Sequence, residues 1–222
     1  KIYFTSNRPR TEDGGDFDLY FSEKLANGSW SIPTNLGSII NTQYNEISPY
    51  IHPDGKSLYF SSTGHNSMGG YDIFMSSFKD GTWSVPQNIG YPINTPEDDI
   101  DFVLAANGKR GYYASVRPEG HGEKDIYVIH FSKDFEDAAP DPVTLYKGII
   151  RNCEGYYLNA DIVITDIDKK EELTNLKSNS ATGKYIVILP KGGKYKVSVK
   201  AEGYLPYYKE ILTSVDEIYK EN

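Results

Sequence analysis

Residues 28–37 read GSWSIPTNLG, and residues 81–90 read GTWSVPQNIG, so the same pattern returns after 53 positions. The same shift carries the Ile-Asn-Thr triplet at residues 40–42 onto the identical triplet at residues 93–95. A series of matches in the same order indicates an internal repeat. Such a repeat is stronger evidence for the fold class than any single motif.

Each repeat contains four short runs of β-forming residues separated by turn residues. In the second repeat we expect strands over residues 47–51, 57–61, 71–77 and 83–86, with His52-Pro53-Asp54-Gly55 as the first turn. Four strands in about fifty residues match the size of a propeller blade. No segment before residue 134 has the 3.6-residue apolar period of a long helix. The sequence therefore predicts that residues 1–133 form four-stranded propeller blades.

Two of these strands have sequences that return three times. A Tyr-Phe-Ser-type strand occurs at residues 2–6, 58–62 and 111–115, and an Asp-Ile-Tyr-type strand at residues 18–20, 72–74 and 125–127. Together with Ser48-Pro49 and the Trp-Ser-x-Pro-x-Asn-x-Gly segments, this pattern resembles the TolB-like, WD40-like propeller repeat, in the version found in envelope proteins of Bacteroidetes. Because the chain begins within a blade and the blade count is short, we expect the earlier blades to lie upstream.

The overall composition agrees with an all-β protein and excludes several function classes. The 222 residues include 19 Tyr, 20 Gly and 12 Pro, which suit pleated strands and tight turns. A net charge of −8 argues against a nucleic-acid partner, and no apolar run approaches the ~20 residues of a membrane span. A single cysteine, Cys153, excludes an intrachain disulfide and a cysteine-cluster zinc site.

A second domain is predicted after the repeats. Residues 134–143 are acidic and proline-rich and are expected to form a linker. Strands are expected near residues 145–150, 161–167, 172–176, 184–189, 195–200 and 207–212, with turns at Thr182-Gly183 and Lys191-Gly192-Gly193. This number of strands predicts a small β-sandwich over residues 144–213. Residues 214–222 are predicted to be a polar tail that leads to a further domain.

The second domain also resembles a known family. Lys147-Gly148, Thr182-Gly183-Lys184-Tyr185 and Gly203-Tyr204 occur in the order found in the carboxypeptidase-regulatory-like domain, a transthyretin-like sandwich. The family's Gly-x-Val-x-Asp start is replaced here by residues 148–152, GIIRN. The two resemblances together imply an OmpA-family envelope protein of the periplasm, associated with the outer membrane. They imply other envelope proteins as partners, among them gliding or type IX secretion components, and peptidoglycan binding through a domain outside this chain.

We find no motif that predicts catalysis, a cofactor or a metal. Asp18, Asp72 and Asp125 recur once per repeat, so a role in capping a loop is favoured over calcium binding. The acidic loops around Asp13 and Asp16 and around residues 97–101 lack EF-hand spacing and are interpreted as solvated surface. His65 and His121 fall in equivalent loops, but two histidines make a poor zinc site.

The predicted function is therefore a non-enzymatic interaction scaffold, with a glycan- or small-ligand-binding propeller as the alternative. Loops that differ between blades are freer to carry specificity than loops that repeat. The divergent loops span residues 8–17, 65–70 and 117–124 and should form one rim of mixed charge. The candidate partner-binding residues of this rim are Arg8, Arg10, Asp13, Asp16, His65, Asn66, Arg117, Glu119, His121 and Lys124. The repeat also predicts that Trp30 and Trp83 occupy equivalent, largely buried positions.

Overall fold

The structure is a computed structural model that describes residues 1–8, 17–105, 108–131, 143–213 and 219–221. These residues form strands and turns and include no helix, so the chain is all-β and no described helix is available to cross a membrane. The chain divides into two compact units, Lys1–Pro140 and Asp141–Asn222. The division falls inside the predicted linker, most of which lies outside the described residues.

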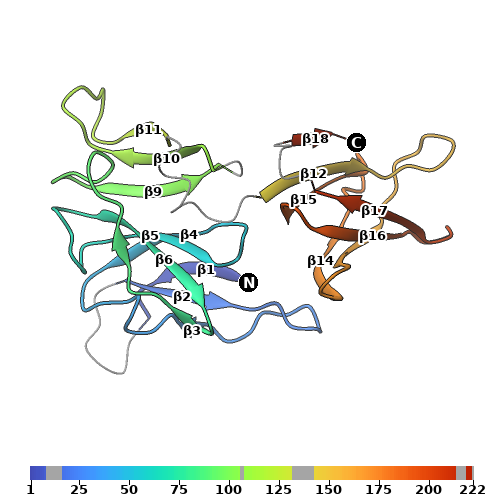
Figure 1. Cartoon of the computed structure of the whole chain (residues 1–222), viewed down its shortest axis with the longest axis horizontal. Coiled ribbons are helices and arrows are strands. Elements are labelled where there is room, and N and C mark those ends of the chain that lie inside the picture. The colour runs from blue at the N-terminus through green and yellow to red at the C-terminus, as the bar shows by residue number, and fades with distance from the viewer. Residues whose placement is uncertain (9–16, 106–107, 132–142, 214–218, 222) are drawn as a thin grey trace. The chain divides into compact units, whose positions relative to one another are not determined.

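The first unit consists of three antiparallel sheets that follow one another along the chain (Figure 1). The first sheet contains β1 (Ile2–Ser6), β2 (Asp18–Ser22) and β3 (Thr34–Asn35). The second contains β4 (Glu46–Ile51), β5 (Ser57–Ser62), β6 (Asp72–Lys79), β7 (Thr82–Trp83) and β8 (Gln87–Asn88). The third contains β9 (Asp99–Leu104), β10 (Arg110–Ser115) and β11 (Asp125–His130).

The second sheet is covered on both faces, which explains why every residue of β5 is buried. Successive strand residues point to opposite faces. Leu58 and Phe60 join a core cluster with Leu19 of the first sheet, whereas Tyr59 joins a second cluster with Phe102 of the third sheet. Burial of these apolar side chains between neighbouring sheets is the main stabilising contribution in this unit.

The Trp-Ser-x-Pro segment does not form the single strand expected over residues 83–86. It splits into β7 and β8, which both pair with β6. Between them, Ser84 replaces regular strand pairing: its N–H donates to the Ser77 carbonyl at 2.8 Å, and its hydroxyl accepts from the Ser77 N–H at 3.0 Å. Pro86 has no N–H with which to continue a ladder. The prediction of one strand was therefore wrong.

The asparagine of each Ile-Asn-Thr triplet is buried and pairs with a strand through its side chain. The Asn94 amide accepts from the Ile73 N–H at 2.9 Å and donates to the Ile73 carbonyl at 2.8 Å. Asn41 forms the same pair of bonds with Leu19, at 2.8 and 3.0 Å. One side chain thus supplies both the acceptor and the donor that a neighbouring strand would supply.

The two tryptophans occupy equivalent strand positions but differ in burial, so the expectation that both are buried was wrong for Trp30. Trp83 pairs with Phe78 and Trp30 with Lys24. Trp83 is 9% exposed, because it packs against Phe78 and against Tyr3 of the preceding sheet, whereas Trp30 is 48% exposed. Among the described residues no sheet covers Trp30 as β1 covers Trp83.

The second unit contains two sheets that share one core. The first has the order β15-β12-β18, and the second has the order β14-β13-β16-β17. Their bounds are β12 (Val143–Ile149), β13 (Asp161–Asp166), β14 (Glu171–Lys177), β15 (Lys184–Pro190), β16 (Lys194–Lys200), β17 (Tyr207–Leu212) and β18 (Tyr219–Glu221). The core includes Tyr146, Ile162, Ile164, Leu189 and Val197.

The strand predictions for this unit were accurate, with one correction at the end of the chain. All six expected strands are present, and the expected turn glycines Gly183 and Gly192 have positive φ, the conformation that glycine adopts most readily. Residues 214–222 were predicted to be a polar tail, but residues 219–221 form β18, which pairs in parallel with β12.

Candidate functional site

The three divergent loops of the first unit connect equivalent strand pairs and leave the same end of their sheets. They join β1 to β2, β5 to β6 and β10 to β11, and each is closed by a Ser–Asp pair. These pairs are Ser6 with Asp18, Ser62 with Asp72, and Ser115 with Asp125. Of the predicted rim residues, Arg10, Asp13 and Asp16 lie outside the described residues.

Two of the three repeated aspartates, Asp72 and Asp125, cap their loops as the sequence predicted, whereas most of the loop before Asp18 lies outside the described residues. Asp72 accepts hydrogen bonds from the Met68 N–H and, at 3.1 Å, from the Asn88 side-chain amide. Asp125 accepts from the His121 N–H at 2.7 Å. In the described residues of the chain, no group of three or more His, Cys, Asp or Glu residues is arranged to hold a metal ion.

One side chain from each loop lies over an equivalent pair of aromatic rings, although the loop sequences differ. The Arg8 guanidinium is 5.0 Å from the Tyr20 ring, the His65 ring is 5.2 Å from the Phe74 ring, and the Arg117 guanidinium is 5.6 Å from the Tyr127 ring. The other rings of these pairs, on the preceding strands, are Phe4, Phe60 and Tyr113. Cations are attracted to the faces of aromatic rings, which accounts for the two arginines, whereas His65 contacts its rings edge-on and at a tilt.

Two of these three side chains also contact the turn that follows the last strand of the preceding sheet. His65 Nε2 lies 3.0 Å from the Ile40 carbonyl oxygen, and Arg117 donates to the Ile93 carbonyl at 2.8 Å. Ile40 and Ile93 are the equivalent residues of the two Ile-Asn-Thr triplets, and each belongs to the repeat before the loop that it contacts. We call this pair of contacts the intersheet latch. His65 and Arg117, predicted as partner-binding residues, therefore already have intramolecular partners.

A buried carboxylate lies beneath each latch. Glu46 and Asp99 are fully buried at equivalent positions, so the interpretation of residues 97–101 as solvated surface was wrong for Asp99. Each carboxylate accepts from the backbone N–H and the hydroxyl of the triplet's threonine, Thr42 or Thr95. Burial raises the pKa of Glu46, and hydrogen bonds from Thr42 and Ser62 oppose this shift. An Asp99 oxygen lies 3.7 Å from the Arg117 guanidinium. Arg117 is therefore the cation placed to compensate a negative charge on Asp99.

The portion of the rim that is free to contact a partner is smaller than predicted. Asn66, Glu119 and His121 are exposed to solvent. Lys124 is also exposed, but its ammonium lies 3.0 Å from an Asp98 carboxylate oxygen. Hydrogen bonding from the Tyr71 N–H, together with Lys124, lowers the pKa of Asp98 against the effect of burial.

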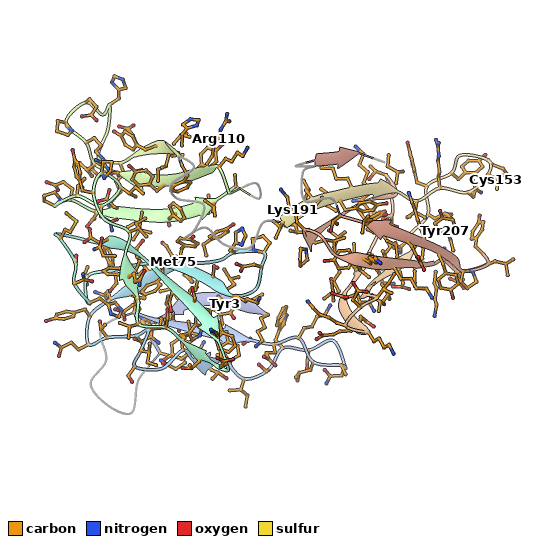
Figure 2. The ribbon with its side chains drawn as sticks, viewed as in Figure 1. Tyr3, Met75, Arg110, Cys153, Lys191 and Tyr207 are labelled. Atoms are coloured by element: carbon orange, nitrogen blue, oxygen red, sulfur yellow. The ribbon has the colours of Figure 1, made fainter. Side chains whose placement is uncertain are left out.

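The second unit contains a cavity that the sequence did not predict. Its volume is about 500 Å³, and it lies between β12 and β15 on one side and β16 and β17 on the other. Most of its lining is aromatic or aliphatic, and its basic groups are Arg151 and Lys209. Figure 2 labels two lining residues, Cys153 on the loop after β12 and Tyr207 at the start of β17.

Comparison with known proteins gives no further assignment, because no protein family, curated protein or solved structure matches this chain.

Proposed function

We propose that the chain is a non-enzymatic interaction scaffold of the bacterial cell envelope. In this proposal the first unit consists of TolB-like β-propeller blades, and the second is a carboxypeptidase-regulatory-like β-sandwich. The whole protein would be an OmpA-family protein of the periplasm, held near the outer membrane by a peptidoglycan-binding domain outside this chain. Its partners would be other envelope proteins, including those of gliding or type IX secretion machinery.

The architecture of the first unit supports the propeller assignment in this proposal. Strands β4, β5, β6 and β8 form an antiparallel array in the order expected of a blade, and β7 extends it at one end. Neighbouring sheets pack through apolar clusters, and the same buried hydrogen bonds recur after 53 residues. In the second unit, two sheets enclose one apolar core, which supports the sandwich assignment.

One observation carries the functional proposal: the framework beneath the loops repeats, while the exposed loop residues do not. A ring pair lies at the base of each loop, and the capping aspartates and the intersheet latch also fix the base of the second and third loops. Above this base, Asn66, Glu119 and His121 are exposed and differ between the repeats. A rigid base that presents variable side chains is the usual arrangement of a recognition surface.

A charge-reversal experiment on the full chain tests this proposal. Glu119→Lys combined with Glu123→Lys changes two exposed residues of the third loop that make no ion pair within the described residues. Capture of envelope proteins by this variant should fall, and capture by the native chain should weaken with salt, because charged surfaces steer association. Glu171→Lys with Glu172→Lys, on exposed positions of β14, is the matched control. Loss of capture in the control alone would place docking on the second unit and overturn the proposal.

A further inference from the structure

The inner face of β17 is left uncovered by the opposite sheet. Tyr207 and Lys209 pair across the strands with Val199 and Val197, and residues directly opposite in an antiparallel pair share a face. Val197 and Val199 belong to the core, so Tyr207 and Lys209 also face the core side. Tyr207 is nevertheless 59% exposed. The strand therefore extends beyond the opposite sheet and forms one wall of the cavity.

A tyrosine ring contributes to the facing wall. Gly148 of β12 pairs with Tyr185 of β15, and a Cβ atom added to Gly148 would lie 2.4 Å from the Tyr185 ring. Glycine at this position therefore allows the Tyr185 ring to approach the β12 backbone closely. Burial, together with the charge effects of Tyr146 and Tyr207 and a hydrogen bond with Tyr146, raises the pKa of Tyr185 to about 12, so its hydroxyl is neutral at pH 7.

The cavity carries positive charge that nothing in its lining compensates. Arg151 and Lys209 line it, and no aspartate or glutamate does. Neither cation forms an ion pair with any residue that the structure describes. The chain as a whole is acidic, with a net charge of −8. A concave, apolar-walled site with two cations concentrates positive potential and attracts anions.

A structural role explains only some of this arrangement. An inward-facing lysine on an edge strand discourages pairing with other chains, and Lys209 on the edge strand β17 fits that role. This role does not require a second cation, Arg151, on a separate segment at the same cavity. It also does not require an aromatic-lined space of about 500 Å³, which falls within the range of small-molecule sites.

We propose that this cavity binds a small amphipathic acid, with an aliphatic or aromatic body and one carboxylate or sulfonate group. The body would pack against Val197, Val199 and the Tyr185 ring, and the anionic group would contact Lys209 and Arg151. Apolar walls with a few placed polar groups are the usual composition of such sites, and the cations would provide specificity. This binding activity is separate from the docking function proposed for the loops of the first unit.

Two related fluorescent probes test the requirement for an anion on the full chain. Anilinonaphthalene sulfonate has an aromatic body and a sulfonate, and phenylnaphthylamine has a similar body without the charge. The sulfonate should bind the native chain more tightly than the neutral probe. Lys209→Met and Arg151→Met should each weaken sulfonate binding about tenfold, the size expected for loss of one charge-assisted contact. Lys194→Met, on the outer face of β16, is the matched control and should leave affinity unchanged.

The single cysteine provides a second readout that locates the probe. Cys153 is exposed and lines the cavity, so bound sulfonate probe should slow its alkylation by a thiol reagent. Ala201→Trp, which fills the cavity, should abolish both the fluorescence signal and this protection. Variants are compared only when they unfold cooperatively in urea like the native chain. Equal affinity for the two probes, or sulfonate binding unchanged by Lys209→Met and Ala201→Trp, would overturn the proposal.

Discussion

His65 Nε2 lies 3.0 Å from the carbonyl oxygen of Ile40, so the loop after β5 is bonded to the turn that follows β3, the last strand of the preceding sheet. Arg117 forms the corresponding contact with Ile93 one repeat later. Two different side chains thus perform the same task at equivalent positions. The exposed residues of these loops differ between the repeats, whereas the contact with the preceding turn is retained.

Arg117→Ala should destabilise the first unit. The side chain donates to the carbonyls of Pro92 and Ile93 and lies beside the buried carboxylate of Asp99. Removing it leaves that charge uncompensated, which costs about 3 kcal/mol. Urea unfolding measures the loss, and Arg110→Ala, at an exposed position of β10, is the control. Equal stability of the two variants would show that the latch contributes nothing.

Asn94→Ala should also lower the free energy of unfolding. It removes a buried amide that bonds both the N–H and the carbonyl of Ile73, and leaves both backbone groups without those partners. The expected cost is about 2–4 kcal/mol. Asn66→Ala removes an exposed amide in the same unit and should change stability by less than about 0.5 kcal/mol. A small effect at Asn94 would mean that water replaces its bonds.

Trp83→Phe and Trp30→Phe should differ in their effects although the two positions are equivalent in the repeat. Trp83 contacts Phe78 and Tyr3, so its truncation should cost about 1–3 kcal/mol, whereas the change at exposed Trp30 should cost under about 1 kcal/mol. Each variant retains one tryptophan. Emission should therefore be blue-shifted in Trp30→Phe and red-shifted in Trp83→Phe, and the reverse order would contradict the fold.

Asp54 should make the first unit sensitive to acid. Burial alone would raise its pKa, but hydrogen bonds from His52, Lys56 and Ser57 outweigh that effect and lower the pKa from 3.8 to about 2. Because the folded-state pKa is lowered, its contribution is present above pH 3.8 and is lost as the pH falls toward about 2.

Asp54→Asn should therefore reduce stability by about 2 kcal/mol at pH 7 and by progressively less below about pH 4. Urea unfolding at several pH values measures this difference. Asp80→Asn changes an exposed turn residue and should show no such dependence. A constant penalty at all pH values would indicate that the turn depends on the shape of Asp54 and not on its charge.

The sequence predicted strands well where short-range patterns determine them. The first three strands of the second repeat were located because turn residues and alternating apolar residues mark their ends, and the loop role of Asp72 followed from its recurrence. The exposure of Trp30 could not be read from the repeat, because it depends on a neighbouring sheet and on Lys24 in place of Phe78. Contacts between repeats form only when the sheets pack together, so they cannot be predicted from a motif within one repeat.

The predicted rim and the cavity likewise depend on contacts between distant residues, which the sequence patterns did not predict. Arg117 appeared variable in sequence, yet its guanidinium reaches a carbonyl 24 residues earlier in the chain. The cavity is built from β12, β15, β16 and β17, whose side chains meet only in the folded unit. One signal was present: Lys209 lies between Tyr207 and Ile211 on the core-facing side of β17, where a covered strand would have an apolar residue.

The latch also determines how the first unit would respond to force. Each sheet is formed by a continuous stretch of chain, and neighbouring sheets are joined by an apolar cluster and by hydrogen bonds that include those of His65 and Arg117. In such a unit each sheet contacts only the sheets that are adjacent to it in the chain. Under tension its sheets should separate in succession, and the hydrogen bonds of His65 and Arg117 are among those that must break at each separation.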